Sequence, residues 1–86
     1  MIQYIYPDGK IENEPYRKFN CNELKRLVCG WFMLTCVDDE SDFYMCFLDT
    51  YGMKISELPE YNQTVKRLYD RDVYGMAIIA PSSAFN

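Results

Sequence analysis

The sequence predicts an α+β domain: a mainly antiparallel sheet of four to five strands with two helices packed on one face. Two strongly apolar runs flank a short acidic turn, which is typical of a β-hairpin. Two other segments combine a helix-capping residue with a helical apolar period. Apolar residues make up 49% of the 86-residue chain. That fraction supports one core and a length this short leaves room for no second, so we expect residues 1–86 to form a single domain.

The chain begins with a predicted strand and turn. Residues 2–6, IQYIY, are rich in β-branched and aromatic side chains, which favour strands. Pro7 and Gly9 then predict a turn, because proline presets one φ and glycine permits a positive one. The polar residues 10–18 are compatible with an edge strand.

A first helix is predicted after residue 19. Asn20 can cap it, and Glu23 follows three residues later, as in a capping box. Leu24, Leu27 and Val28 recur at helical spacing and predict its buried face. Gly30 predicts its end.

The two apolar runs are WFMLTCV at 31–37 and FYMCFL at 43–48, and they predict a hairpin. The turn between them carries four carboxylates: Asp38, Asp39, Glu40 and Asp42. If Val37 pairs with Phe43, strand alternation places Trp31, Met33, Val37, Phe43, Met45 and Phe47 on one face. The other face carries Phe32, Leu34, Cys36, Tyr44, Cys46 and Leu48. Both faces are apolar, so the second face should be covered by the chain's own loops or by a partner.

The last part of the chain predicts a turn at 49–54, a second helix and a final strand. Asn62 can cap a helix that runs to Tyr69, with Val65, Leu68 and Tyr69 on its inner face. Residues 73–80, VYGMAIIA, form an apolar run that predicts a central strand. Pro81 ends this strand, and residues 82–86 are expected to form a tail.

Composition excludes several kinds of chemistry. The chain has no histidine, which removes histidine-based acid–base and zinc sites, and its net charge of −4 provides no basic face for direct nucleic-acid binding. The four cysteines lack the paired CxxC spacing of zinc sites, so we expect reduced and mostly buried thiols, with no metal and no cofactor. No secretory signal or membrane span is recognisable. We therefore expect a location in the cytoplasm of a host cell and no membrane contact.

Three stretches resemble a family of short α+β proteins of unknown function from phages, prophages and other mobile elements. They are LKRLVCGWFML, FLDTYGMKISELPEYNQTVKRL and DVYGMAIIAPSSAF. The shared features fall at Gly30, at Asp49 with Gly52, at Leu58-Pro59 with Asn62, and at Gly75. The cysteines and the long acidic turn depart from the family pattern. The resemblance implies an accessory protein of viral or mobile-element origin and carries over no catalytic residue.

The leading expectation is a non-catalytic inhibitor of a host defence component, similar to an anti-CRISPR protein. Its partner would be a host protein or a protein–nucleic acid complex with a basic surface. The expected binding residues are Asp38, Asp39, Glu40, Asp42, Tyr44, Tyr51 and Tyr61. One alternative is a binder that sequesters a signalling nucleotide, which would need convergence of Arg17, Lys18, Lys25, Arg26, Lys66, Arg67 and Arg71. Another is a structural or assembly module. The two-sided apolar hairpin also predicts a homodimer.

Overall fold

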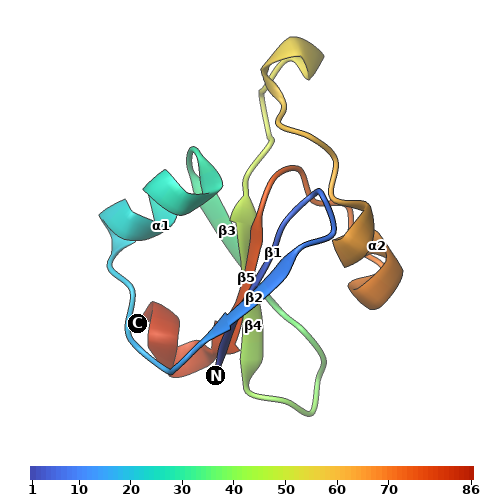
Figure 1. The fold of residues 1–86 in the computed structure, drawn as a ribbon. Coiled ribbons are helices and arrows are strands. Elements are labelled where there is room, and N and C mark those ends of the chain that lie inside the picture. The colour runs from blue at the N-terminus through green and yellow to red at the C-terminus, as the bar shows by residue number, and fades with distance from the viewer.

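A computed structural model describes residues 1–86 and contains a five-stranded antiparallel sheet (Figure 1). The strands are β1 Ile2–Ile5, β2 Ile11–Glu14, β3 Phe32–Cys36, β4 Phe43–Leu48 and β5 Ala77–Pro81. Their order across the sheet is β2-β1-β5-β4-β3. The predicted α+β class is confirmed, and the polar segment after the first turn does form an edge strand. The final strand is central, as its apolar run predicts, but it begins at Ala77 rather than Val73 and includes Pro81.

Both predicted helices are present with their predicted caps. Helix α1 spans Cys21–Val28 and α2 spans Gln63–Tyr69. The side chain of Asn20 accepts a hydrogen bond from the backbone N–H of Glu23, and Asn62 accepts one from Val65. These bonds satisfy N–H groups that have no partner within the first turn of a helix.

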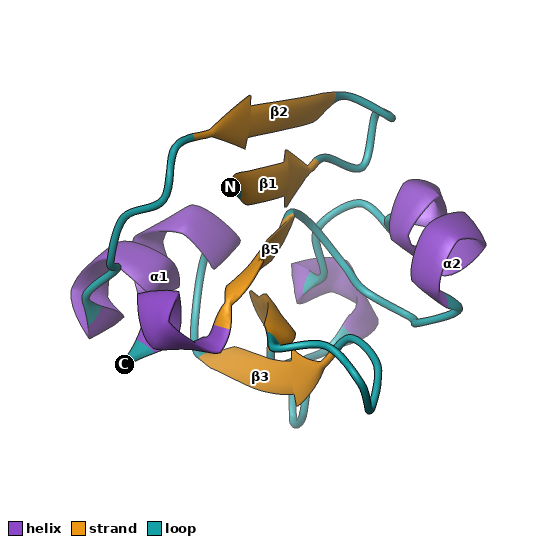
Figure 2. Ribbon diagram, turned by 90° about the horizontal axis from the view of Figure 1, so that it is seen from below, coloured by secondary structure: helices purple, strands orange, loops and turns teal.

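The two helices lie on opposite faces of the sheet, so the prediction that both pack on one face is wrong (Figures 1 and 2). Neighbouring residues of a strand point to opposite faces. In β5, Ile78 belongs to the core cluster that contains Leu24 and Val28 of α1. The next residue, Ile79, belongs to the cluster that contains Val65 of α2. The central strands are apolar on both faces, and each face needs its own cover.

The hairpin has the predicted register. The N–H of Val37 donates to the carbonyl of Phe43 at 3.0 Å, and Cys36 pairs with Tyr44. The two faces of the hairpin therefore carry the predicted side chains. Their cover comes from α1 and α2 rather than from residues 10–18, and it leaves β3 at the edge of the sheet partly exposed.

The C-terminal residues belong to the core, and the prediction of a tail is wrong. Residues Ser82–Phe85 form a short 3-10 helix, η2. Phe85 stacks on Phe19 with ring centroids 5.8 Å apart, and the N–H of Phe19 donates to the carbonyl of Ala84. A second correction concerns α2, where Leu68 points to solvent and Thr64 is buried in its place.

Asn62 joins three segments at the centre of the fold. Its side chain is buried. The amide nitrogen donates to the carbonyls of Ile5 at 3.0 Å and Gly75 at 2.9 Å, while the amide oxygen caps α2. One amide thus holds β1, the entry to α2 and the entry to β5 in fixed positions, which explains how a polar side chain is tolerated in the core.

Candidate functional site

The acidic turn, residues 38–42, contains two carboxylates with structural roles. Asp38 Oδ1 accepts hydrogen bonds from the backbone N–H groups of Glu40 at 2.8 Å and Ser41 at 2.7 Å. Asp42 accepts a hydrogen bond from the hydroxyl of Ser82 at 2.7 Å, and its own carbonyl accepts one from the N–H of Ser82. Asp38 therefore shapes the turn, and Asp42 ties it to η2.

The other two carboxylates of the turn have no such role. Asp39 and Glu40 are exposed, and their side chains make no hydrogen bond or ion pair within the chain. Only these two of the four predicted acidic residues are wholly available to a partner. The four acidic residues therefore do not act as one unit. Asp38 and Asp42 build the turn, and Asp39 and Glu40 face solvent.

A second surface contains two of the predicted binding residues, Tyr51 and Tyr61, but the sequence does not predict its projecting shape. Residues 49–61, which we call the arm, leave β4 and project beyond the sheet before returning to α2 (yellow to gold at the top of Figure 1). Tyr51 and Ile55 on this arm are 94% and 88% exposed. Isolated exposed apolar residues are common, but here two large ones lie within five residues of each other on a segment that projects from the sheet.

The arm is held in shape by its own hydrogen bonds. At its start, Asp49 Oδ1 accepts from the N–H of Tyr51 at 3.0 Å, and Gly52 adopts a positive φ of 80°. The short 3-10 helix η1, Ile55–Glu57, begins where the N–H of Lys54 donates to the Glu57 carboxylate at 2.8 Å. The backbone is therefore ordered while both apolar side chains remain in water.

The structure does not bring the predicted binding residues together. The acidic turn lies at one end of the β3–β4 hairpin, and the arm with Tyr51 leaves the other end (Figure 1). Tyr44 lies within β4, paired with Cys36 and Ala80. Tyr61 packs edge-on against Tyr74 and donates to Asp72 at 2.7 Å. The tyrosines thus belong to three separate environments.

Four of the seven basic residues named for the nucleotide-binding alternative are held at separate places. Arg17 is bound by two glutamates, and Lys66 pairs with Asp70 at 2.9 Å. The Nζ atom of Lys25 lies 3.8 Å from the ring centroid of Trp31. Arg71 donates to the carbonyl of Cys36 at 3.1 Å. These cations already have separate partners within the chain.

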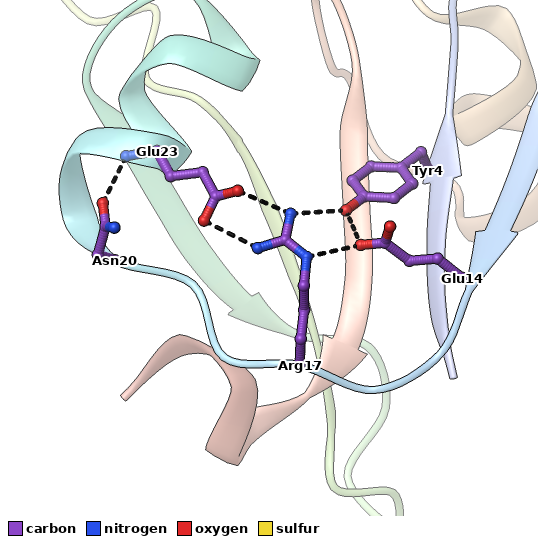
Figure 3. Close-up of polar contacts among 5 residues, drawn as sticks. All are labelled: Tyr4, Glu14, Arg17, Asn20 and Glu23. Carbon is purple, nitrogen blue, oxygen red and sulfur yellow. Dashed lines mark hydrogen bonds and ion pairs between the residues drawn. The ribbon is translucent and has the colours of Figure 1, made fainter.

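The most connected polar cluster surrounds Arg17 (Figure 3). Its Nε atom donates to Glu14 at 2.9 Å, and its two terminal nitrogens contact the Glu23 carboxylate at 2.9 Å and 2.7 Å. Glu14 also accepts a hydrogen bond from the hydroxyl of Tyr4. The guanidinium carbon lies 4.3 Å from the ring centroid of Phe19. The cluster joins β1, β2 and α1 on one face of the sheet.

The electrostatics of this cluster favour a structural role. Burial and the hydrogen bond to Glu14 raise the pKa of Tyr4 to about 12. The hydrogen bond from Tyr4 lowers the pKa of Glu14, and the one from Arg17 lowers that of Glu23. General acid–base catalysis works best with groups whose pKa lies near the working pH. Here the pKa of each group is shifted further from neutral pH, so each group keeps one protonation state near neutral pH.

An open depression of about 390 Å³ lies between the acidic turn and α2. Val37, Phe43, Tyr69 and Ile79 contribute its apolar walls, with Asp38 and Ser41 among the polar lining residues. No lysine or arginine lines it, so it offers no counter-charge to a phosphate. This depression therefore gives the nucleotide-binding alternative no support.

The cysteines are free thiols, but the expectation that most are buried is wrong. Cys21 and Cys29 are exposed at the two ends of α1, Cys36 is half-buried, and only Cys46 is buried. Burial raises the pKa of the Cys46 thiol to about 12. No group of three or more cysteine, aspartate or glutamate side chains is arranged to hold a metal ion.

No protein-family model, curated protein or solved structure shows a significant match to the chain. No helix combines the length and apolar character that a membrane crossing requires. The functional interpretation consequently rests on the geometry described above, in which Tyr51 and Ile55 of the arm and the outer carboxylates Asp39 and Glu40 of the acidic turn face solvent.

Proposed function

We propose that this protein is a non-catalytic accessory protein of a phage or mobile element that binds a host defence component and inhibits it. The arm is the observation that carries the proposal, because it presents Tyr51 and Ile55 almost fully to solvent. Neither side chain contributes to the core. Exposed apolar side chains lower the solubility of a protein and add nothing to the stability of its fold. A partner that covers both side chains would explain why they are exposed.

The order of the arm makes it a favourable binding element. Association is weakened when flexible segments must be fixed in place, and this cost falls when the bound shape already exists in the free protein. The hydrogen bonds at Asp49 and Lys54 supply that order. Tyrosine is also frequent among the few interface residues that carry most of the binding energy.

The acidic turn suggests the electrostatic character of the partner. Asp39 and Glu40 face solvent without partners, and the net charge of the chain is −4. Exposed charges at the rim of an interface mainly accelerate encounter with an oppositely charged surface. A nuclease complex with a basic nucleic-acid channel has such a surface and is the class of host target that we propose.

A phage-plaquing assay tests this function. Bacteria that carry a nuclease-based defence, such as a CRISPR–Cas effector, would express the wild-type protein or the double variant Tyr51→Ser, Ile55→Ser. We expect the wild type to restore plaquing of a phage that the defence targets, and the double variant to lose most of this effect. Ile11→Ser, a change at an exposed apolar residue on β2, is the matched control and should retain it.

Two results would overturn the proposal. One is a wild-type protein that leaves plaquing unchanged in every strain tested, each strain carrying a different nuclease-based defence. The other is full inhibition by the double variant at equal amounts of folded protein, which would remove the arm from the binding surface.

A further inference from the structure

The two edges of the sheet differ sharply in chemistry. The outer strand β2 has the sequence IENE, and charges at Glu12 and Glu14 oppose pairing with another strand. The other outer strand, β3, has the sequence FMLTC and contains no charge and no proline. Natural sheets usually protect an exposed edge with charged residues or proline. Because β3 has neither, whereas β2 has charges, we expect the β3 edge to have a partner.

The backbone of β3 is suitably oriented for pairing. In an antiparallel ladder, alternate residues direct both backbone groups to the same neighbour. Trp31 accepts a hydrogen bond from Asp49, and Val37 donates to Phe43, so the odd-numbered residues face β4. Phe32, Leu34 and Cys36 consequently direct their N–H and carbonyl groups to the open edge. Arg71 occupies one lone pair of the Cys36 carbonyl oxygen, and the second lone pair remains.

We propose that β3 pairs antiparallel with β3 of a second copy of this chain, around a twofold axis at Leu34. The five-stranded sheets would then join into one continuous sheet. Leu34 would face its own counterpart, and Phe32 would face Cys36 of the other copy. A twofold arrangement of this kind is closed, because each copy offers its single uncharged edge to the other.

The pairing provides contacts for side chains that the monomer leaves exposed. Trp31 is 69% exposed and would lie opposite Val37 of the second copy. This is a non-hydrogen-bonded pair, the kind in which opposed side chains approach most closely. Met33 would lie opposite Thr35 in the same way. The apolar surface of the β3 edge would thus become an interface.

Charge complementarity supports a second copy as the occupant of the edge. Antiparallel pairing around Leu34 places the acidic turn of one copy beside the Trp31 end of β3 in the other. Lys25 lies at that end, against the Trp31 ring. Asp39 of each copy would therefore lie near Lys25 of the other, twice in each dimer. A parallel arrangement would instead bring the two acidic turns together.

Light scattering after size-exclusion chromatography, combined with the fluorescence of the single tryptophan, tests the proposal. We expect the wild type to show twice the chain mass of 10.2 kDa at high micromolar concentration. Trp31 emission should shift to the blue as concentration rises, because its ring becomes buried. Leu34→Lys should give a monomer, since two like charges would meet at the axis. Ile11→Lys, on the other edge, should remain dimeric.

A charge exchange gives a second measurement if Leu34→Lys does not fold. Lys25→Glu alone should weaken the dimer by at least several-fold, and adding Asp39→Lys should restore much of the loss. A monomeric wild type with unchanged Trp31 emission up to about 1 mM would overturn the proposal, as would a dimer unaffected by Leu34→Lys. Amide protection of Phe32–Cys36 by another protein in an otherwise monomeric chain would also overturn it and assign the edge to that protein.

Discussion

The carboxylate of Asp38 lies 2.7 Å from the backbone nitrogen of Ser41, so one of the acidic residues holds its own turn together. Asp39, the next residue, makes no comparable contact. Residues that look equivalent in the sequence therefore have different roles. The contrast predicts different effects on stability.

Asp38→Ala should lower the free energy of unfolding by about 1 kcal/mol, because two backbone N–H groups lose their acceptor. Asp39→Asn should change it by less than about 0.5 kcal/mol, since its carboxylate is exposed and unpaired. Urea denaturation of both variants measures the difference. Equal stability of the two variants would contradict the structural role of Asp38.

Asn62→Ala should be among the most damaging single changes, at about 2–4 kcal/mol. It removes the cap of α2 and leaves two carbonyls without a donor, those of Ile5 and Gly75. Asn62→Asp is the informative comparison, because it keeps the capping acceptor but replaces the donor with a buried carboxylate oxygen that faces both carbonyls. A thermal melt would reveal both losses, with each kcal/mol lowering Tm by about 4–8 °C in a domain of this size. A wild-type Tm for Asn62→Ala would disprove the role of the amide.

Tyr4 and Tyr6 should keep their protons well above the ordinary range of tyrosine. Burial raises the pKa of Tyr4 to about 12, and the hydrogen bond to Glu12 raises that of Tyr6 to about 12. The unfolded chain loses these protons near pH 10, so it binds fewer protons than the folded chain between pH 10 and 12. Stability should therefore fall as pH rises through this window.

Chemical denaturation at pH 9 and pH 11 measures that fall. Tyr4→Phe should reduce the difference in stability between the two pH values. Ultraviolet titration of the native protein offers an independent check. Ionisation of every tyrosine near pH 10 in the folded state would refute the assignment.

Two of the four thiols should react quickly with a thiol reagent in the native protein. Cys21 and Cys29 are exposed, whereas Cys46 is buried with a raised thiol pKa. Mass spectrometry after brief labelling should identify the first two and leave Cys46 unmodified. Denaturation should then expose all four. Rapid native labelling of Cys46 would show that the core around β4 opens easily.

Local signals in the sequence predicted most of the fold. The caps at Asn20 and Asn62 and the register at Val37 depend on residues close together in the chain, and the structure confirms all three. The placement of α2 opposite α1 depends on contacts between distant segments. Strand alternation in β5 cannot determine which helix covers which face.

The candidate site was less predictable for the same reason. Charge and aromatic content drew attention to the acidic turn and to Tyr44, which occupies a paired strand. The same criteria selected Tyr51 and Tyr61 on the arm, but its sequence predicted only a glycine-containing turn at 49–54. Nothing in its local sequence indicates that Tyr51 and Ile55 remain exposed, because exposure depends on which other segments pack nearby. The sequence did show that both faces of the hairpin are apolar. Most of the hairpin's large apolar residues that remain exposed in the structure lie along the β3 edge.

The affinity of the arm for its target tests whether the arm is the docking surface. Once the plaquing assay identifies the inhibited complex, surface plasmon resonance can compare the wild type with Tyr51→Ser, Ile55→Ser. A pair of central interface residues is worth about 2–4 kcal/mol, so Kd should rise by roughly 30-fold to 1,000-fold, mainly through faster dissociation. Ile11→Ser should bind like the wild type. An unchanged Kd for the double variant would contradict the central claim that the arm is the docking surface.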